Sequence, residues 1–140
     1  MHRSLLNLLA LTLLSLSLFS LPIWAGDDES TSPQALYYKF PEPITINFQR
    51  QSKKEMRLLQ VKIALMSYDQ DIIDNASRNL PMLHDSLRTL FTEQTMESVS
   101  TVTGRKEIQS TALSTLKTIF KEETGKDSLE AVYFTSFIMQ

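Results

Sequence analysis

Few side chains in this sequence could carry chemistry, and their spacing builds no catalytic group. His84 directly precedes Asp85, and neighbouring residues on a helix point about 100° apart, so the two do not form an acid–base pair. No cysteine is present, which excludes thiolate nucleophiles, disulfides and zinc held by cysteine. The glycines Gly26, Gly104 and Gly125 are too dispersed for a phosphate-binding loop. We therefore expect no catalytic, cofactor-binding or metal-binding residue, and a structural or surface role for His84.

Three aspartates, Asp69, Asp71 and Asp74, could suggest a cation site. An EF-hand loop needs a glycine at its turn and a distal glutamate, and this spacing provides neither. A helical pattern begins at the same point. Asp69 therefore suits the N-cap of a helix, and the other two suit the positive end of its dipole. We interpret the cluster as a helix start.

A basic cluster lies between the first two predicted strands and comprises Arg50, Lys53, Lys54 and Arg57. Charged loops are usually just solvated, which is the simplest interpretation of these cations. They could also contact anionic lipid headgroups or a partner protein. Lys53 and Lys54 are for that reason candidate partner contacts.

The first residues have the composition of an export signal. Arg3 supplies a positive start, a leucine-rich apolar run occupies 5–21, and Pro22 ends it. Residues 1–25 therefore predict a signal peptide that is cleaved between Ala25 and Gly26. The alternative is an uncleaved membrane anchor, because about 20 apolar residues suffice to span a bilayer. In either case we expect the remainder to lie outside the inner membrane.

The remaining chain fits one small domain without strong charge. The sequence has 140 residues, a formal net charge of −2 and a pI of about 5.7. This balance argues against binding to nucleic acid, which needs a clustered excess of lysine and arginine. Residues 26–40 are expected to form an acidic linker and an aromatic arm with Tyr37, Tyr38 and Phe40. The arm could pack on its own domain or dock a neighbouring subunit.

Residues 41–140 predict an α+β domain in the order β-β-α-α-β. Strict alternation indicates a hairpin of two strands, at 44–49 and 59–65. A helical stripe runs from Ile72 to Phe91, with a kink or break expected at Pro81. A second helix should run from a cap at Thr103 to Gly125. The last strand, 129–139, is apolar on both faces near its end, so we expect it to be central or covered on both sides. One sheet with two helices on a face would bury every stripe.

Five stretches in this order carry a resemblance to a known family: 46–48, 57–65, 81–87, 104–106 and 132–137. From about Tyr38 onward the chain resembles FliL, the flagellar basal body-associated family. The resemblance implies a periplasmic domain similar to the stomatin/prohibitin domain, with no enzymatic activity and no cofactor. It also implies self-assembly, possible rings, and contact with the stator proteins MotA and MotB in support of torque, swimming or swarming.

Two departures from the family pattern change these expectations. Family members usually keep an N-terminal transmembrane helix after a cytoplasmic tail, whereas this sequence has almost no tail and a predicted cleavage site. His84 stands where the family often has a basic residue. We therefore expect a FliL-like paralogue in the periplasm at the basal body, or in the inner membrane if it is uncleaved. The alternative function is a generic periplasmic adaptor or ligand-binding module unrelated to the motor.

Overall fold

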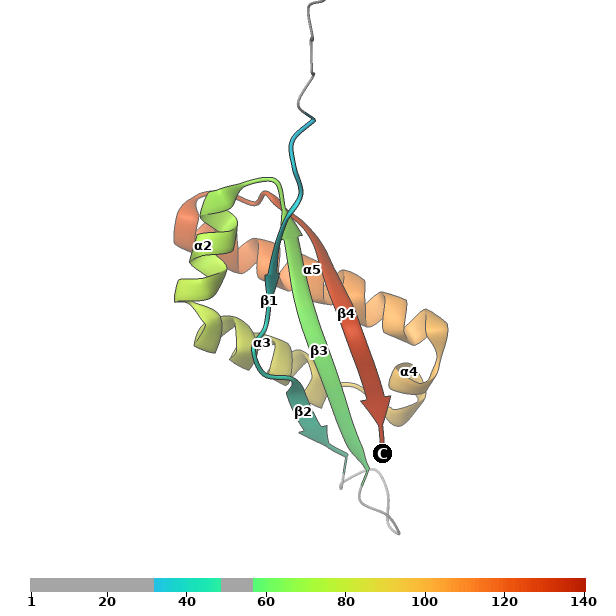
Figure 1. The fold of residues 1–140 in the computed structure, drawn as a ribbon. Coiled ribbons are helices and arrows are strands. Elements are labelled where there is room, and N and C mark those ends of the chain that lie inside the picture. Colours follow the sequence, from blue (N-terminus) through green and yellow to red (C-terminus); the bar gives the residue numbers. More distant parts are fainter. Residues whose placement is uncertain (1–31, 49–56) are drawn as a thin grey trace, which may run out of the picture. The chain divides into compact units, whose positions relative to one another are not determined.

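One long central strand organises the structure. The computed structural model describes residues 32–48 and 57–140, in which a four-stranded antiparallel sheet carries helices on one face (Figure 1). The elements are, in chain order, β1 (Leu36–Lys39), β2 (Ile44–Asn47), β3 (Leu58–Ser67), α2 (Gln70–Arg78), α3 (Leu80–Thr92), α4 (Met96–Ser100), α5 (Val102–Thr124) and β4 (Leu129–Met139). The small α+β class expected from the sequence is confirmed. The predicted signal peptide, its cleavage site, and Lys53 and Lys54 lie outside the described residues.

The sheet is built around β3, which has neighbours on both edges. On one edge, β1 pairs with its C-terminal part, 64–67, and β2 with its N-terminal part, 58–61. On the other edge, β4 follows β3 along its whole length, with register shifts at Thr135 and Glu130. Pro41 and Pro43 separate β1 from β2, because proline has no N–H to offer to a sheet.

Strand β1 is the first difference from the predicted order. The segment expected as an arm forms a strand, with Leu36 and Tyr38 turned toward the core and Tyr37 and Lys39 exposed. The Phe40 N–H donates to the Ile63 carbonyl at 3.0 Å, which extends this pairing by one residue. Sequence periodicity over four residues before a proline is too short to separate a strand from an extended arm.

The position of β4 is the second difference. A central place, or cover on both faces, was expected, but among the described residues β4 pairs with β3 alone and is an edge strand. Its face toward the helices carries Phe134 and Phe137, whose ring centroids lie 5.4 and 6.4 Å from that of Phe91. Its other face exposes 39% of Tyr133 and 42% of Ile138. β4 thus carries apolar residues on both faces, but only the face toward the helices is covered by the described residues.

The helices follow the predicted apolar stripe, but the described residues form four helices where two were predicted. The first helix breaks at Asn79, which is the C-cap of α2 and the N-cap of α3. Pro81 lies in the first turn of α3, where its missing N–H costs nothing. The cap of the last helix is Thr101 and not Thr103: the Thr101 hydroxyl accepts from the Gly104 N–H at 3.0 Å. Gly125 ends α5 with φ of 74°, as predicted.

Helix α4 was not predicted. Its five residues are too few to show a period, and a capping box starts it instead. The Thr95 hydroxyl accepts from the Ser98 N–H while the Ser98 hydroxyl accepts from the Thr95 N–H, both at 3.1 Å. Gly104 lets α4 pack closely on α5, because a Cβ at this position would lie 2.1 Å from the Ser98 carbonyl oxygen.

The core lies between the sheet and the helices. The predicted inward face of β3 is confirmed, and the stripe of the helices meets it. Both sets have side chains that are at most 1% exposed: Leu59, Val61, Ile63, Leu65, Ile72, Leu83, Leu87, Phe91, Leu116 and Phe120. The face of the sheet turned away from the helices carries no second layer among the described residues (Figure 1). Within the described ranges, that open face, the sheet edges and the seams between helix and strand are surfaces that a partner can reach.

Candidate functional site

The acidic cluster is part of a polar junction that ties the start of α2 to the start of β4. The Asp69 carboxylate caps α2 by accepting from the Asp71 N–H at 3.0 Å, which confirms the predicted cap. It also accepts from the Ser128 hydroxyl at 3.0 Å. The Ser67 hydroxyl, fully buried, donates to the Ser128 carbonyl at 2.6 Å and accepts from the Asp69 N–H.

A lysine ammonium lies between the two carboxylates of this junction. The Lys126 Nζ lies 3.0 Å from Asp69 Oδ2 and also donates to the Asp71 carboxylate. The hydrogen bond from Lys126 is the main reason why the pKa of Asp69 falls below its ordinary value. Conversely, the hydrogen bonds to Asp71 and Asp69 raise the pKa of Lys126. The contacts of Asp69 and Asp71 at this junction are therefore those of a helix cap and of an ion pair with Lys126.

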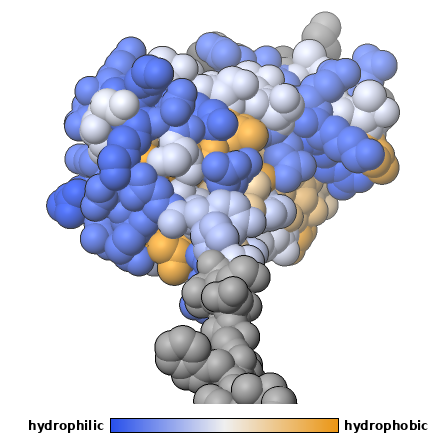
Figure 2. All heavy atoms as spheres, turned by 90° about the horizontal axis from the view of Figure 1, so that it is seen from above, coloured by the Kyte–Doolittle hydropathy of each residue, from blue (hydrophilic) through white to orange (hydrophobic). Residues whose placement is uncertain are grey.

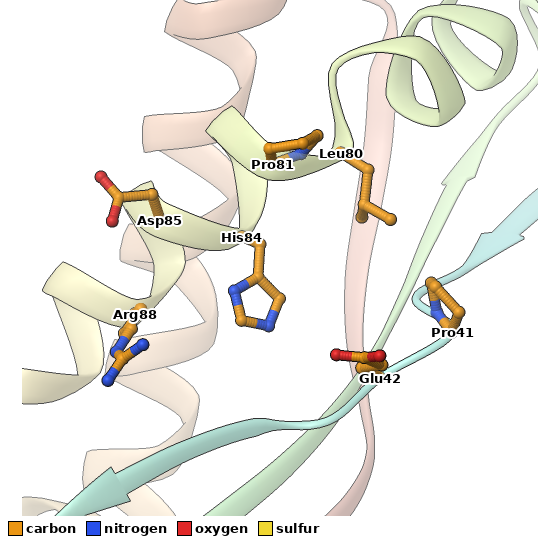
Figure 3. A pocket seen from close by; sticks show the side chains of 7 residues that line it. All are labelled: Pro41, Glu42, Leu80, Pro81, His84, Asp85 and Arg88. Atoms are coloured by element: carbon orange, nitrogen blue, oxygen red, sulfur yellow. The ribbon is translucent and has the colours of Figure 1, made fainter.

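A pocket of about 440 Å³ opens between α3 and the chain that joins β1 to β2 (Figure 3). It is lined by Pro41, Glu42, Leu80, Pro81, His84, Asp85 and Arg88. The two prolines that separate the strands and start the helix thus also shape its walls. Sequence reasoning singled out His84 but missed the other lining residues, because the two walls come from segments about 40 residues apart in the chain.

The pocket is lined by the charged residues Glu42, Asp85 and Arg88 and by His84. His84 points between the two walls, and its ring stacks on Phe40 with the centroids 6.4 Å apart. Glu42 lies on the opposite wall, and the Asp85 carboxylate points away from His84 (Figure 3). No serine, threonine or cysteine lines the pocket. The arrangement could hold a small polar molecule or a peptide side chain.

The three aromatic residues of the predicted arm have different environments. Phe40 is 7% exposed and belongs to the core, and Tyr38 packs beside it with the ring centroids 6.0 Å apart. Only Tyr37 is on the surface, 56% exposed on the open face of the sheet. Its ring centroid lies 6.4 Å from that of Tyr133. Tyr133 was not among the predicted contacts, since strand register decides which residues become neighbours.

The remaining surface is mostly hydrophilic where Figure 2 shows it, with small and separate hydrophobic patches. In the described ranges, no helix combines the length and apolar character that a membrane span needs. Over the same ranges, no group of three or more His, Cys, Asp or Glu side chains is placed to bind a metal ion. The candidate sites on the described residues are the pocket beside His84 and the open sheet face that carries Tyr37 and Tyr133.

The comparison with known families identifies the family of this chain. The family model of the flagellar basal body-associated protein FliL matches residues 37–140, which include every described helix and almost every described strand residue. The chain therefore belongs to the FliL family of flagellar basal body-associated proteins. The family resemblance noted in the sequence is confirmed.

A curated relative supports the same assignment at low identity. The flagellar protein FliL of Aquifex aeolicus (strain VF5) is 22% identical to this chain over 105 residues. The match covers 75% of this chain and 62% of the relative, so the chain spans less than two thirds of that protein's length.

Proposed function

We propose that this protein is a non-enzymatic accessory protein of the bacterial flagellar motor. In this proposal it binds or organises stator units of the MotA/MotB type at the basal body and so supports torque, swimming or swarming. The observation that carries the proposal is the family match over residues 37–140. A pocket lined by no serine, threonine or cysteine, and exposed aromatic residues on an uncovered sheet face, support a role in contact and not in catalysis.

The proposed location is the periplasm, at the basal body. If the segment 1–25 is removed as a signal peptide, no anchor from that segment holds the protein, and its position must come from binding to other proteins. Several weak contacts made together by a homo-oligomeric ring can supply this, because linked binding events multiply in effect. The expected similarity to the stomatin/prohibitin-like domain belongs to the same proposal. If segment 1–25 is retained, the protein is tethered to the inner membrane.

The location is tested with a functional fluorescent fusion and two deletion strains. We expect foci at the flagellar bases that disappear when the stator genes are removed. Deleting the gene for this protein should weaken swimming most under viscous load, while filaments still assemble. Foci that persist without stators would indicate another basal-body partner. An even periplasmic distribution, together with normal motility at every load, would refute the motor function.

A matched pair of tyrosine variants tests the open face of the sheet. Tyr37→Ser removes half of the exposed aromatic pair, whereas Tyr68→Ser removes a tyrosine that is 50% exposed at the turn before α2. Exposed aromatic residues are frequent anchors of protein contacts. We expect Tyr37→Ser to weaken the foci and the swimming under load, and Tyr68→Ser to leave both unchanged.

The alternative function is a periplasmic adaptor or ligand-binding module, and the pocket beside His84 is the observation that favours it. A pocket of about 440 Å³ is within the size range of small-molecule sites. Under this alternative, His84→Gln would impair function in a folded and normally abundant protein. Under the motor proposal, the same variant should keep full motility.

A further inference from the structure

The outer edge of β4 offers backbone groups to a further strand. Leu58 and Gln140 exchange both of their backbone hydrogen bonds, at 2.7 and 2.9 Å. In an antiparallel ladder such pairs alternate with pairs that do not bond to each other. Phe137 and Met139, which face Val61 and Leu59, therefore direct their N–H and C=O groups away from β3. Within the described ranges no other strand pairs with β4.

The register shifts at Glu130 and Thr135 interrupt this edge, but it has few other features that protect sheet edges. Its eleven residues include no proline and no lysine, and Glu130 is the only charged residue. One outward group is occupied: the Gln109 side chain of α5 donates to the Val132 carbonyl at 2.5 Å. That bond occupies a backbone acceptor in the first half of the edge, which a further strand would need. The second half, from Phe134 to Met139, stays open to a partner.

A groove runs beside the open half of the edge. It has a volume of about 370 Å³ and is lined by Val102, Arg105, Lys106, Gln109, Tyr133, Phe134 and Phe137. A smaller hollow of about 250 Å³ shares Lys106 and Gln109 and continues the groove along α5. One wall is therefore the exposed side of a helix, and the other is a strand edge with aromatic side chains.

The charge of the groove is positive. Arg105 and Lys106 are its only charged residues, and no carboxylate lines it. The Arg105 guanidinium lies 5.5 Å from the Phe137 ring centroid, which holds the cation beside the strand. Neither cation belongs to any of the salt bridges formed within the described parts of the chain. The groove thus has an apolar floor, two available cations and open backbone groups.

We propose that this groove binds an extended segment of a partner protein that carries carboxylate side chains, added as a strand to the outer edge of β4. Main-chain hydrogen bonds to Phe137 and Met139 would fix the segment, as in other cases of strand addition. Its carboxylates would pair with Arg105 and Lys106. Its apolar side chains would cover Phe134 and Phe137. The open face of the sheet that carries Tyr37 adjoins this groove and shares Tyr133 with it.

The inference does not depend on the motor function. Binding of a peptide in vitro tests the groove, whereas the position of a fluorescent fusion in cells tests the motor. Either experiment can therefore fail while the other succeeds.

The test uses the purified full chain and two synthetic peptides. One alternates valine with glutamate, and the matched peptide has lysine in place of glutamate. We expect the glutamate peptide to bind about tenfold more tightly, the effect of roughly two exposed ion pairs. We also expect it to slow hydrogen exchange at the Phe137 and Met139 amides. Equal affinities, no binding at millimolar peptide, or binding that leaves these amides unprotected would each overturn the proposal.

Charge reversal on α5 supplies the matched variants. Lys106→Glu should remove most of the preference for the glutamate peptide. It should still fold, because a carboxylate suits the N-terminal part of a helix. Lys117→Glu, on the same helix but outside the groove, should keep the preference. Hydrogen exchange at the Phe137 and Met139 amides could instead slow as the protein concentration rises without peptide. That result would overturn the proposal and show that a second copy of this chain covers the edge.

Discussion

A few polar side chains join the start of α2 and the segment after α5 to the end of β3. Ser67 ends β3 and Ser128 precedes β4, and Asp69 links both to the first turn of α2. The sequence predicted the cap at Asp69 from the local pattern. The pairing of Asp69 with Lys126 was not predictable, because the two residues are far apart in the sequence and come together only in the folded structure, where Lys126 follows α5.

Removing the ammonium at this junction should have a pH-dependent effect. The pKa of Asp69 is lowered from 3.8. The contribution of its carboxylate to the free energy of unfolding is therefore present above that value and is lost as the pH falls through the lowered pKa. The pKa of Lys126 is raised from 10.5. The contribution of its ammonium to the free energy of unfolding is therefore present below that value and is lost as the pH rises through the raised pKa. Lys126→Met should therefore destabilise the protein at pH 7, and the difference from wild type should shrink below about pH 4.

Urea unfolding at pH 7 and pH 3 measures this difference. The matched control is Lys121→Met, which removes a more exposed pair with Asp127 at 3.4 Å. The control should change the free energy of unfolding less, because water screens exposed pairs. An effect of Lys126→Met that is as large at pH 3 as at pH 7 would show that lost packing, and not charge, explains it.

Core packing gives a second prediction for a single residue. Leu87 is fully buried in α3, so Leu87→Ala should lower the free energy of unfolding by about 2–5 kcal/mol. Met82→Ala on the same helix, where the side chain is 36% exposed, should cost much less. Chemical denaturation of both variants tests the prediction, and equal losses would contradict the assignment of the buried face.

Whole helices and strands were predictable where a period repeats over enough residues. The ten-residue β3 and the stripe of α3 and α5 show such repeats, and their buried faces agree with the sequence. The short β1 depends on its pairing with β3, and α4 depends on a capping box; neither leaves much periodic signal. The edge position of β4 and the pocket beside His84 depend on register and on the meeting of distant segments. Local sequence does not specify either.

The packing of α4 against α5 gives a prediction at the level of elements. Gly104→Ala would place a methyl group against the Ser98 carbonyl, so the two helices must move apart. We expect a loss of about 1–3 kcal/mol, reduced by the better helix propensity of alanine. Thr103→Ala, at an exposed position in the same turn, is the control. An unchanged melting temperature for Gly104→Ala would mean that α4 is not held at this distance.

For the molecule as a whole, the prediction concerns where the mature chain begins. The composition around Pro22 favours cleavage between Ala25 and Gly26. Mass spectrometry of the protein isolated from cells should therefore give an N-terminus at Gly26, and the protein should be released with the periplasmic extract. A form that keeps residues 1–25 and is found only in membranes would contradict cleavage and support an anchor.

The pairing of β3 with β4 has a consequence for how the chain folds. The two strands are neighbours in the sheet, yet all four described helices lie between them in the sequence. Contacts this distant require a large loop to close before they contribute, which slows folding. Until β4 arrives, one edge of the apolar strand β3 is unpaired and can associate with other chains. We therefore expect aggregation during refolding to depend more on protein concentration than on the stability of the final fold.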